Sequence, residues 1–241
     1  MTYTSIENEH IKEIKKLNQK KYRDLNNKFI VEGEHIVNEA IKANIVEEIL
    51  LLEGNEITYK GKVSFVTIKV LKYITELENP SKVIAVCKKI NNVIKGNHIL
   101  ALDNIQDPGN LGTIIRSAVA FNIDTIILSK NTVDLYNSKV LRSTQGMIFN
   151  INIVVSDLEK EIKELKNKNY KILTTKVDGG KLIKNIEKKE KFVIIIGNEG
   201  NGVSEQLQQL SDEYIYIKMN EKCESLNAAI ATSISLYELS R

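Results

Sequence analysis

Cysteine and histidine are scarce in this chain of 241 residues, which contains two cysteines and three histidines. Cys87 and Cys223 are too few for a disulfide framework, and they lack the spacing of metal ligands. The histidines, His10, His35 and His98, stand beside no cysteine and no acidic cluster. We therefore expect no metal site, and we expect any catalysis to proceed without histidine as the acid or base.

Long apolar runs are also missing from the chain. No stretch approaches the roughly 18 apolar residues that span a bilayer, and residues 1–16 lack the apolar core of a signal peptide. The composition, 42% hydrophobic and 27% charged, is ordinary for a globular protein. The length suits one large domain or two smaller ones. We expect a soluble, cytoplasmic protein.

Positive charge is concentrated near the N-terminus, although the net charge of the whole chain is only +3. Residues 10–28 contain seven basic residues and two acidic ones, a local net charge of +5. Such a patch can neutralise the phosphates of a nucleic acid. A solvated helix face explains the same charges equally well.

Two patterns of secondary structure divide the chain. From residue 98 onward, apolar strands alternate with amphipathic helices, which predicts a parallel sheet with helices on both faces. The strands read ILALD, TIILS, INIVV, YKILTT, KFVIIIG and YIYIK. Residues 1–90 predict a small α/β domain with a helix at 11–19, a strand and a helix across 28–43, and strands at 46–54, 63–67 and 82–88. The polar segment 91–97 is the expected linker, and residues 98–241 form the second domain.

The loop that follows the first of these strands reads DPGNLGTIIRSA, from Asp107 to Ala118. A glycine turn between a strand and a helix is typical of nucleotide sites, but the dinucleotide fingerprint GxGxxG and the P-loop GK[ST] are both missing. This argues against a nucleotide-dependent oxidoreductase. Asn110 is a candidate cap for the helix. Arg116, six residues later, is either a surface arginine or a functional one.

Two later loops also follow apolar strands, where ligands of parallel sheets bind. FVIIIGNEGNGVS places Glu199 among three glycines, which let a backbone approach a ligand closely. YIYIKMNEKCESLNAA leads into a helix rich in small residues, for which Ser225 is a candidate N-cap. Taken singly, each loop is also consistent with an ordinary turn between a strand and a helix.

Together, DPGNLGTIIRSA, IIIGNEGNGVS and IKMNEKCESLNAA resemble motifs one, two and three of the SpoU (TrmH-type) RNA ribose 2′-O-methyltransferases of the SPOUT superfamily. The three motifs occur in order within residues 98–241, and residues 8–40 resemble the family's N-terminal substrate-binding domain. The resemblance implies an α/β fold with a deep trefoil knot, S-adenosyl-L-methionine as methyl donor, and a homodimer with sites at its interface. The knot is implied by the resemblance alone, because knots are rare in proteins.

The resemblance also implies which residues form the site. The catalytic set would be Asn110, Arg116, Glu199, Ser225 and Asn227. The cofactor would lie against loops that contain Thr174, Thr175, Gly197, Asn198, Gly200, Ile217, Met219, Leu226, Asn227 and Ala228. For RNA we expect contacts from Lys20, Lys21, Arg23 and Arg142. The third motif departs from the family pattern, because Lys218 replaces the usual proline and residues 221–223 replace small residues.

The implied function is methylation of a ribose 2′-hydroxyl, with large-subunit ribosomal RNA favoured over transfer RNA. A tRNA methyltransferase and a non-catalytic RNA-binding protein with the same fold are the alternatives, although the intact motifs argue against the second. A free guanidinium has a pKa above about 12. Our hypothesis is therefore that Arg116 stays cationic, stabilises the developing alkoxide, and holds a phosphate that takes the proton.

Overall fold

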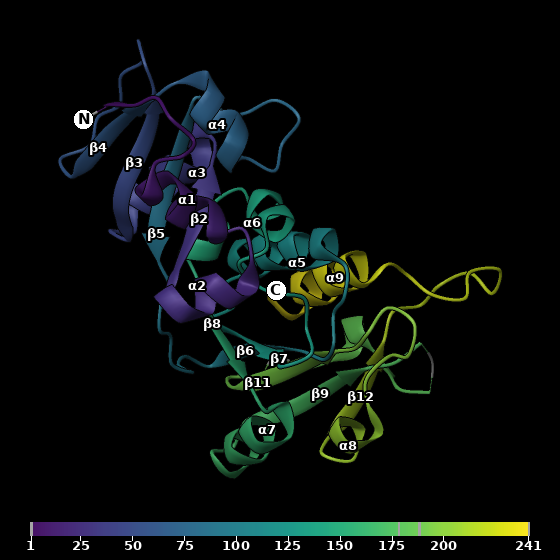
Figure 1. Ribbon diagram of the computed structural model, residues 1–241. Helices are drawn as coiled ribbons and strands as arrows, with labels where there is room; N and C mark the ends of the chain where they lie inside the picture. The colour runs from purple at the N-terminus through teal and green to yellow at the C-terminus, as the bar shows by residue number, and fades with distance from the viewer. Residues whose placement is uncertain (1, 178, 188, 241) are drawn as a thin grey trace. The chain divides into compact units, whose positions relative to one another are not determined.

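The computed structural model describes residues 2–177, 179–187 and 189–240, and the chain divides into two compact units (Figure 1). Unit 1 comprises Met1–Asn91 and Asp134–Phe149, and unit 2 comprises Asn92–Val133 and Asn150–Arg241. These units differ from the expected domains 1–90 and 98–241 in two respects, because the segment 134–149 packs in unit 1 and most of the expected linker 91–97 belongs to unit 2. The domain limits themselves stay a prediction.

Unit 2 contains a seven-stranded sheet in which every strand is parallel to its neighbours, in the order β10-β12-β9-β11-β6-β7-β8. The strands are β6 (His98–Leu102), β7 (Thr125–Ser129), β8 (Asn152–Ser156), β9 (Lys171–Thr175), β10 (Lys181–Leu182), β11 (Phe192–Ile196) and β12 (Glu213–Tyr216). The parallel sheet predicted from the apolar strands is therefore confirmed. All five residues of β11 are buried, as expected for a central strand covered on both faces.

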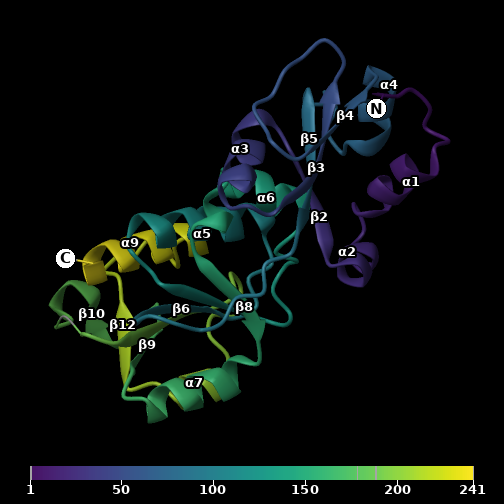
Figure 2. The same ribbon diagram turned by 90° about the vertical axis from the view of Figure 1, so that its left-hand side faces the viewer.

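Helices cover both faces of this sheet (Figure 2). On one face lie α5 (Pro108–Ala120) and α9 (Ala228–Ser240), which pack against each other. On the other lie α7 (Leu158–Asn167) and α8 (Glu205–Gln208), where Ile162, Leu165 and Leu207 join the sheet residues in one apolar cluster. A short 3-10 turn, η2 (Ile183–Asn185), follows β10. Because parallel strands all end at the same edge, the loops after β6, β9, β11 and β12 can meet there.

Unit 1 is built on a mixed five-stranded sheet in the order β1-β4-β3-β5-β2. The strands are β1 (Thr2–Tyr3), β2 (Lys28–Glu32), β3 (Val46–Leu52), β4 (Lys62–Val66) and β5 (Val83–Lys88). Its helices are α1 (Glu9–Lys16), α2 (Lys20–Asn26), α3 (Glu34–Lys42), α4 (Ile68–Ile74) and α6 (Ser138–Thr144), followed by the 3-10 turn η1 (Met147–Phe149). An apolar cluster that includes Ile14, Leu50, Leu71 and Ile84 forms the core.

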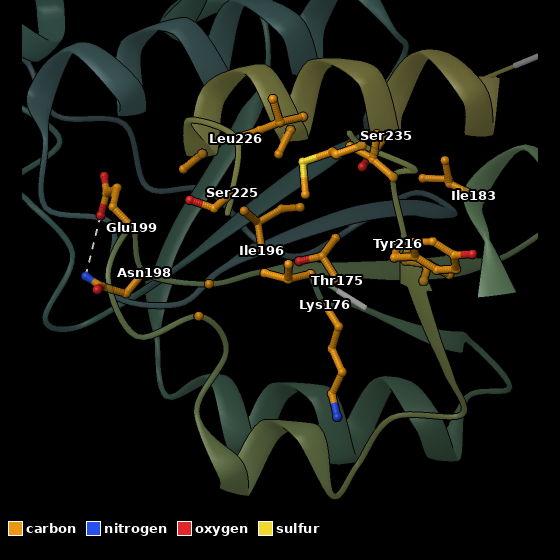
Figure 3. Close-up of a pocket in the computed structure, with 18 of the residues that line it drawn as sticks. Thr175, Lys176, Ile183, Ile196, Asn198, Glu199, Tyr216, Ser225, Leu226 and Ser235 are labelled. Atoms are coloured by element: carbon orange, nitrogen blue, oxygen red, sulfur yellow. Dashed lines mark hydrogen bonds between the residues drawn. The ribbon is translucent and has the colours of Figure 1, made fainter. Parts of the chain in front are cut away.

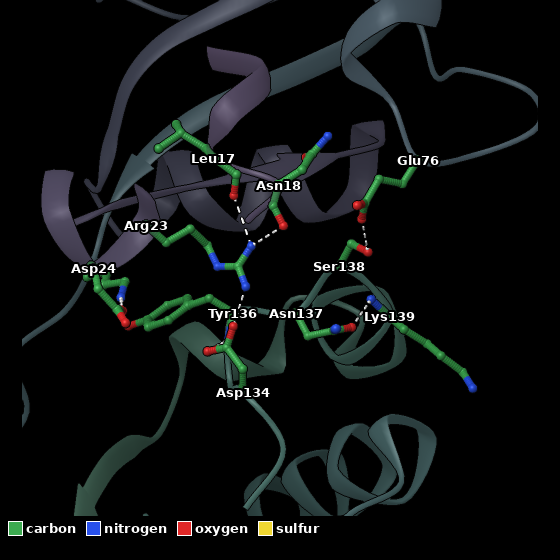
Figure 4. A network of polar contacts seen from close by, with 11 residues as sticks. Leu17, Asn18, Arg23, Asp24, Glu76, Asp134, Tyr136, Asn137, Ser138 and Lys139 are labelled. Atoms are coloured by element: carbon green, nitrogen blue, oxygen red, sulfur yellow. Dashed lines mark hydrogen bonds and ion pairs between the residues drawn. The ribbon is translucent and has the colours of Figure 1, made fainter. Parts of the chain in front are cut away.

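Arg23 connects two distant parts of unit 1 (Figure 4). Its guanidinium donates hydrogen bonds to the backbone carbonyls of Leu17 and Asn18, at 2.9 and 2.6 Å, and forms an ion pair with Asp134. The arginine is only 6% exposed. Because Asp134 lies just before α6, this buried ion pair holds the segment 134–149 against the N-terminal residues.

Several short elements were not predicted from the sequence. They are β1, β10, α2 and α4, of which β1 and β10 have two residues each. Such edge strands are too short to show an alternating pattern. Within the described ranges, no helix has both the length and the apolar character needed to cross a membrane.

We predict that Asp134→Ala destabilises the protein. The substitution leaves the Arg23 guanidinium buried without its charge partner, and breaking one side of a buried ion pair costs about 3 kcal/mol. Urea denaturation should therefore show a free energy of unfolding that is lower by about this amount.

Asp24→Ala is the matched control, because the Asp24 side chain is 53% exposed and pairs with Lys89, whose side chain is 14% exposed. A pair with one solvent-exposed partner contributes less than the Arg23 pair, in which both side chains are mostly buried. An equal decrease in the free energy of unfolding in the two variants would show that the Arg23–Asp134 ion pair stabilises the protein no more than the Asp24–Lys89 pair does.

Candidate cofactor-binding and catalytic site

A pocket of about 220 Å³ opens in unit 2, where β9, β11 and β12 end beneath α9 (Figure 3). Five chain segments line it: the end of β9, η2, the loop after β11, the end of β12, and the residues from Ser225 into α9. Its lining residues are Thr175, Lys176, Val177, Ile183, Ile196, Gly197, Asn198, Glu199, Gly200, Gly202, Ile215, Tyr216, Ile217, Met219, Ser225, Leu226, Ala228, Ala231 and Ser235.

The loop after β11 is held in a tight shape by its own residues. The Asn198 side chain accepts hydrogen bonds from the backbone N–H groups of Gly200 and Asn201, at 2.9 and 3.1 Å, and donates one to the carbonyl of Asn104 at 2.8 Å. Gly197 faces the returning chain so closely that a β-carbon there would lie 2.0 Å from the carbonyl carbon of Gly202. Only glycine fits at position 197, and the loop therefore presents its backbone to the pocket.

Glu199 is the carboxylate of this loop, and it accepts hydrogen bonds from four donors, one of which is the side-chain amide of the adjacent Asn198 at 3.5 Å. The Asn110 amide donates to it at 2.9 Å, and the backbone N–H groups of Gln106 and Asp107 donate at 3.4 Å each. Burial alone would raise the pKa of the Glu199 carboxyl, but these hydrogen bonds outweigh it and lower the pKa below its usual value. Glu199 is therefore ionised at neutral pH.

Asn110 joins Glu199 to the third motif. While its amide nitrogen donates to Glu199, its amide oxygen accepts a hydrogen bond from the Asn227 side chain at 2.9 Å. The Asn227 oxygen in turn accepts from the backbone N–H groups of Ala229 and Ile230, at 2.9 and 3.3 Å. Three of the predicted catalytic residues thus form one hydrogen-bonded chain.

This arrangement corrects two expectations about helix caps. Asp107, not Asn110, caps α5, because its side chain accepts from the Asn110 backbone N–H at 2.7 Å. Asn227, not Ser225, caps α9 through the bonds to its first turn. Both errors have the same cause. In each helix two residues of capping type lie within three positions of each other, and the sequence does not show which of the two forms a tertiary contact instead of capping the helix. Ser225 instead lines the pocket.

Arg116 lies outside the pocket, although it is on the same helix as Asn110. Six residues along α5 correspond to a rotation of about 240°, which points the two side chains in different directions. Arg116 is exposed, and among the described residues it has no hydrogen-bond or ion-pair partner. The structure therefore brings Glu199, Asn110, Asn227 and Ser225 together but leaves Arg116 apart from them.

Most of the residues expected to hold the cofactor line the pocket. They are Thr175, Gly197, Asn198, Gly200, Ile217, Met219, Leu226 and Ala228. Thr174 is fully buried and does not line it, because successive side chains of a strand point to opposite faces. Asn227 is absent from the lining and acts instead in the hydrogen-bonded chain.

Sequence reasoning missed several lining residues, among them Ile183, Tyr216, Ala231 and Ser235. Ala231 and Ser235 could have been found, because Ala231 follows Ala228 by three residues and Ser235 follows Ala231 by four, which places all three on one face of the helix. Ile183 could not, because no pattern places η2 at the pocket.

The residues expected to bind RNA all belong to unit 1. Lys20 and Lys21 are exposed on α2, and Arg142 is partly exposed on α6. Arg23 is buried in its ion pair with Asp134, so its charge is not available to a phosphate. We therefore do not include Arg23 in the RNA-binding surface proposed below.

The side chains that line the pocket provide a carboxylate, an amide, hydroxyl groups and apolar surfaces. Figure 3 shows Glu199 and Asn198 at one end, and Ile183 and Ser235 at the other. Among the described residues, no group of three or more histidine, cysteine, aspartate or glutamate side chains could hold a metal ion. The pocket is suited to an organic ligand with one charged part and one flat, apolar part.

Two family models match the chain. Residues 97–237 match the SpoU rRNA Methylase family, and residues 8–85 match the MRM3-like substrate binding domain. The first match contains all the pocket residues, and the second contains α1 to α4.

Individual relatives agree with these matches. The 23S rRNA (guanosine(2553)-2′-O)-methyltransferase RlmP of Bacillus subtilis is 37% identical over 241 residues, which cover 98% of this chain and 97% of the relative. The AdoMet-bound rRNA methyltransferase of Sinorhizobium meliloti has a TM-score of 0.88 at 30% identity, covering 99% of this chain and 97% of the other. A crystal structure of an RNA 2′-O ribose methyltransferase has a TM-score of 0.84 at 25% identity, covering 99% and 98%.

We predict that Gly197→Ala and Gly200→Ala behave differently. At position 197 a β-carbon would overlap the backbone of Gly202 and Val203, whereas at position 200 it would meet only the Asn198 side-chain oxygen at 3.6 Å. Gly197→Ala should lower the free energy of unfolding by about 1–3 kcal/mol, the usual range for overpacking. Thermal unfolding followed by circular dichroism measures the difference.

Gly200→Ala should change the stability of the free protein by less than about 0.5 kcal/mol, as at an unconstrained surface position. A Gly197→Ala protein as stable as the unaltered chain would contradict the close approach of the two strands of this loop.

Proposed function

The chain belongs to the SpoU family of rRNA methylases, and we propose that its substrate is large-subunit ribosomal RNA. It is an RNA ribose 2′-O-methyltransferase that uses S-adenosylmethionine. The observation that carries the choice of RNA is the similarity to the 23S rRNA methyltransferase over nearly the full length of both chains. A ribosomal substrate also supports the cytoplasm as the place of action.

The residues that line the pocket support S-adenosylmethionine as its ligand. Ile183, Ile196 and Leu226 provide apolar walls for a flat base, and the ionised Glu199 lies at the other end, where it can face a positive charge. The Gly197 turn leaves backbone groups open to a ligand. We propose that the lining residues around these three positions hold the cofactor.

S-adenosylmethionine supplies a methyl group activated by a sulfonium, which a ribose 2′-oxygen can attack. The chain must place that oxygen in line with the methyl group and exclude water. Glu199 cannot donate a proton at neutral pH, because it is already ionised, and its lowered pKa makes it a weak base. We propose that Glu199, fixed by Asn110 and Asn227, orients a cation or a ribose hydroxyl, and that Ser225 contacts the substrate from the pocket rim.

Arg116 remains our proposed catalytic arginine, but it cannot serve the pocket of its own chain from where it lies. We propose a homodimer in which Arg116 of each subunit serves the pocket of its partner. The exposed apolar face of α9 supports this, because Ile230 is 52% and Tyr237 is 45% exposed, seven residues apart on one side of the helix. At the partner's pocket, the cationic guanidinium would stabilise the alkoxide and hold a phosphate.

RNA recognition is proposed for unit 1. Lys20 and Lys21 lie within the part of the chain that matches a substrate-binding domain, and both side chains are exposed. Arg142 on α6 is the third proposed contact. Neutralising phosphates with such side chains makes binding strongly dependent on salt.

The trefoil knot expected for unit 2 also belongs to this proposal. The strand order supports it. Strand β11 lies between β9 and β6, and β12 lies on the other side of β9. The chain therefore returns to the middle of the sheet for β11 and then crosses over β9 again to form β12.

Methyl transfer from labelled S-adenosylmethionine tests the proposed substrate. We expect the label to enter 23S ribosomal RNA at a single ribose 2′-oxygen, as shown by reverse-transcription stops at low nucleotide concentration, and not to enter bulk transfer RNA. Label on transfer RNA alone would reverse the choice of RNA. Absence of transfer to both, with intact cofactor binding, would favour a non-catalytic RNA-binding protein.

Mixed dimers test the placement of Arg116. An Arg116→Ala subunit has an intact pocket but no arginine, and an Ala231→Leu subunit keeps the arginine but fills its own pocket. Each homodimer should be inactive. A purified mixed dimer contains one complete site if Arg116 acts in the partner's pocket, and we expect about half of the unaltered activity. An inactive mixed dimer, with both homodimers inactive, would show that Arg116 acts within its own chain. An active Arg116→Ala homodimer would show that Arg116 has no catalytic role.

A further inference from the structure

Helix α9 presents three small residues to the pocket: Ala228, Ala231 and Ser235. Ser235 differs from the two alanines because it brings a polar group into the wall. Its side chain is fully buried, and its hydroxyl has no hydrogen-bond partner among the residues that the structure describes. A buried hydroxyl without a partner is uncommon in proteins and is unfavourable for folding.

The neighbouring hydroxyls of α9 show that this is a particular property of Ser235. Thr232 donates to the carbonyl of Ala228 at 2.6 Å, and Ser233 donates to the carbonyl of Ala229 at 2.7 Å. Both use the carbonyl four residues earlier, which is the ordinary partner of a hydroxyl inside a helix. The Ser235 hydroxyl forms no such bond and is directed into the pocket (Figure 3).

The position of Ser235 indicates which part of a ligand it faces. Ser235 and Ile183 lie at the opposite end of the pocket from Glu199 and Asn198, and Tyr216 is on the same side as Ser235 (Figure 3). Apolar residues dominate this end, including the buried Ile183 and Ile215. A flat base with apolar faces and a polar edge suits such surroundings, whereas the charged sulfonium and amino-acid groups suit the carboxylate end.

We propose that Ser235 is a cofactor-binding residue whose hydroxyl forms a hydrogen bond with the edge of the adenine ring. This rests on the proposed function of the pocket as the S-adenosylmethionine site. The hydrogen bond fixes the base at the closed end of the pocket and selects a purine that has a polar group at that edge. The hydroxyl that is left without a partner in the free protein gains one when the cofactor binds.

Ser235→Ala tests the assignment by two effects of opposite sign. Removing a buried hydroxyl that has no partner should leave the melting temperature of the cofactor-free protein equal or higher. Losing a hydrogen bond to the ligand should weaken binding about three- to tenfold. Isothermal titration calorimetry should show this loss for S-adenosylmethionine, for S-adenosylhomocysteine and for 5′-methylthioadenosine, which has the base but no amino-acid group. In methyl transfer, KM for the cofactor should rise by the same factor, with kcat and KM for RNA unchanged.

Thr67→Val is the matched control. The Thr67 hydroxyl is also buried without a partner, but it belongs to unit 1 and lines no part of this pocket. We expect this variant to keep the affinity of the unaltered protein for all three ligands.

Three other outcomes overturn the proposal in distinguishable ways. Unchanged affinity of Ser235→Ala for every ligand shows that the hydroxyl does not contact the cofactor. A loss that appears with S-adenosylmethionine and S-adenosylhomocysteine but not with 5′-methylthioadenosine places the hydroxyl at the amino-acid part. Failure of the unaltered protein to bind any of the three overturns the proposed function of the pocket, and the assignment of Ser235 with it.

Discussion

The hydrogen-bonded chain from Asn227 through Asn110 to Glu199 joins the starts of α5 and α9 and the loop after β11. Asn110 lies 89 residues before Glu199 and 117 before Asn227, so no local preference of the chain could bring them together. The parallel sheet does so, because its strands deliver all three segments to one edge. The hydrogen bonds of Asn227 fix the position where α9 begins. The position of that first turn determines which α9 residues line the pocket.

Strand periodicity was enough to predict the architecture of unit 2, because long apolar strands that alternate with amphipathic helices permit few arrangements. The sequence did not predict the role of a side chain that could form either a local hydrogen bond or a contact with a distant residue. Asp107 and Asn110 are equally good caps by residue type. Only the position of Glu199 explains why Asp107 takes the local role and Asn110 the distant one. Likewise, nothing in the basic segment 10–28 indicates that Arg23 is buried, since its partner Asp134 is 111 residues away.

Arg23 and Arg116 show how burial separates two arginines that the sequence presents as equally functional. Arg23 is enclosed by carbonyls and a carboxylate, so its charge is used inside unit 1. Arg116 stays exposed and unpaired among the described residues, while the ionised Glu199 of the same unit is held by amides and backbone N–H groups. A guanidinium with five donors has a strong tendency to pair with a carboxylate or a phosphate. Its isolation within one chain supports the proposal that a second subunit and an RNA backbone complete the site.

The protonation states in the pocket limit what the chain can contribute to methyl transfer. Glu199 carries its charge already, and the hydrogen bonds that lower its pKa would be weakened if it took a proton. A guanidinium group is in general an equally poor base. The proton of the ribose hydroxyl must therefore leave to a group outside these two, of which an RNA phosphate or water is the simplest. The chain then accelerates the reaction by position and electrostatics, which explains how a protein with three histidines, none of which lines the pocket, performs this chemistry.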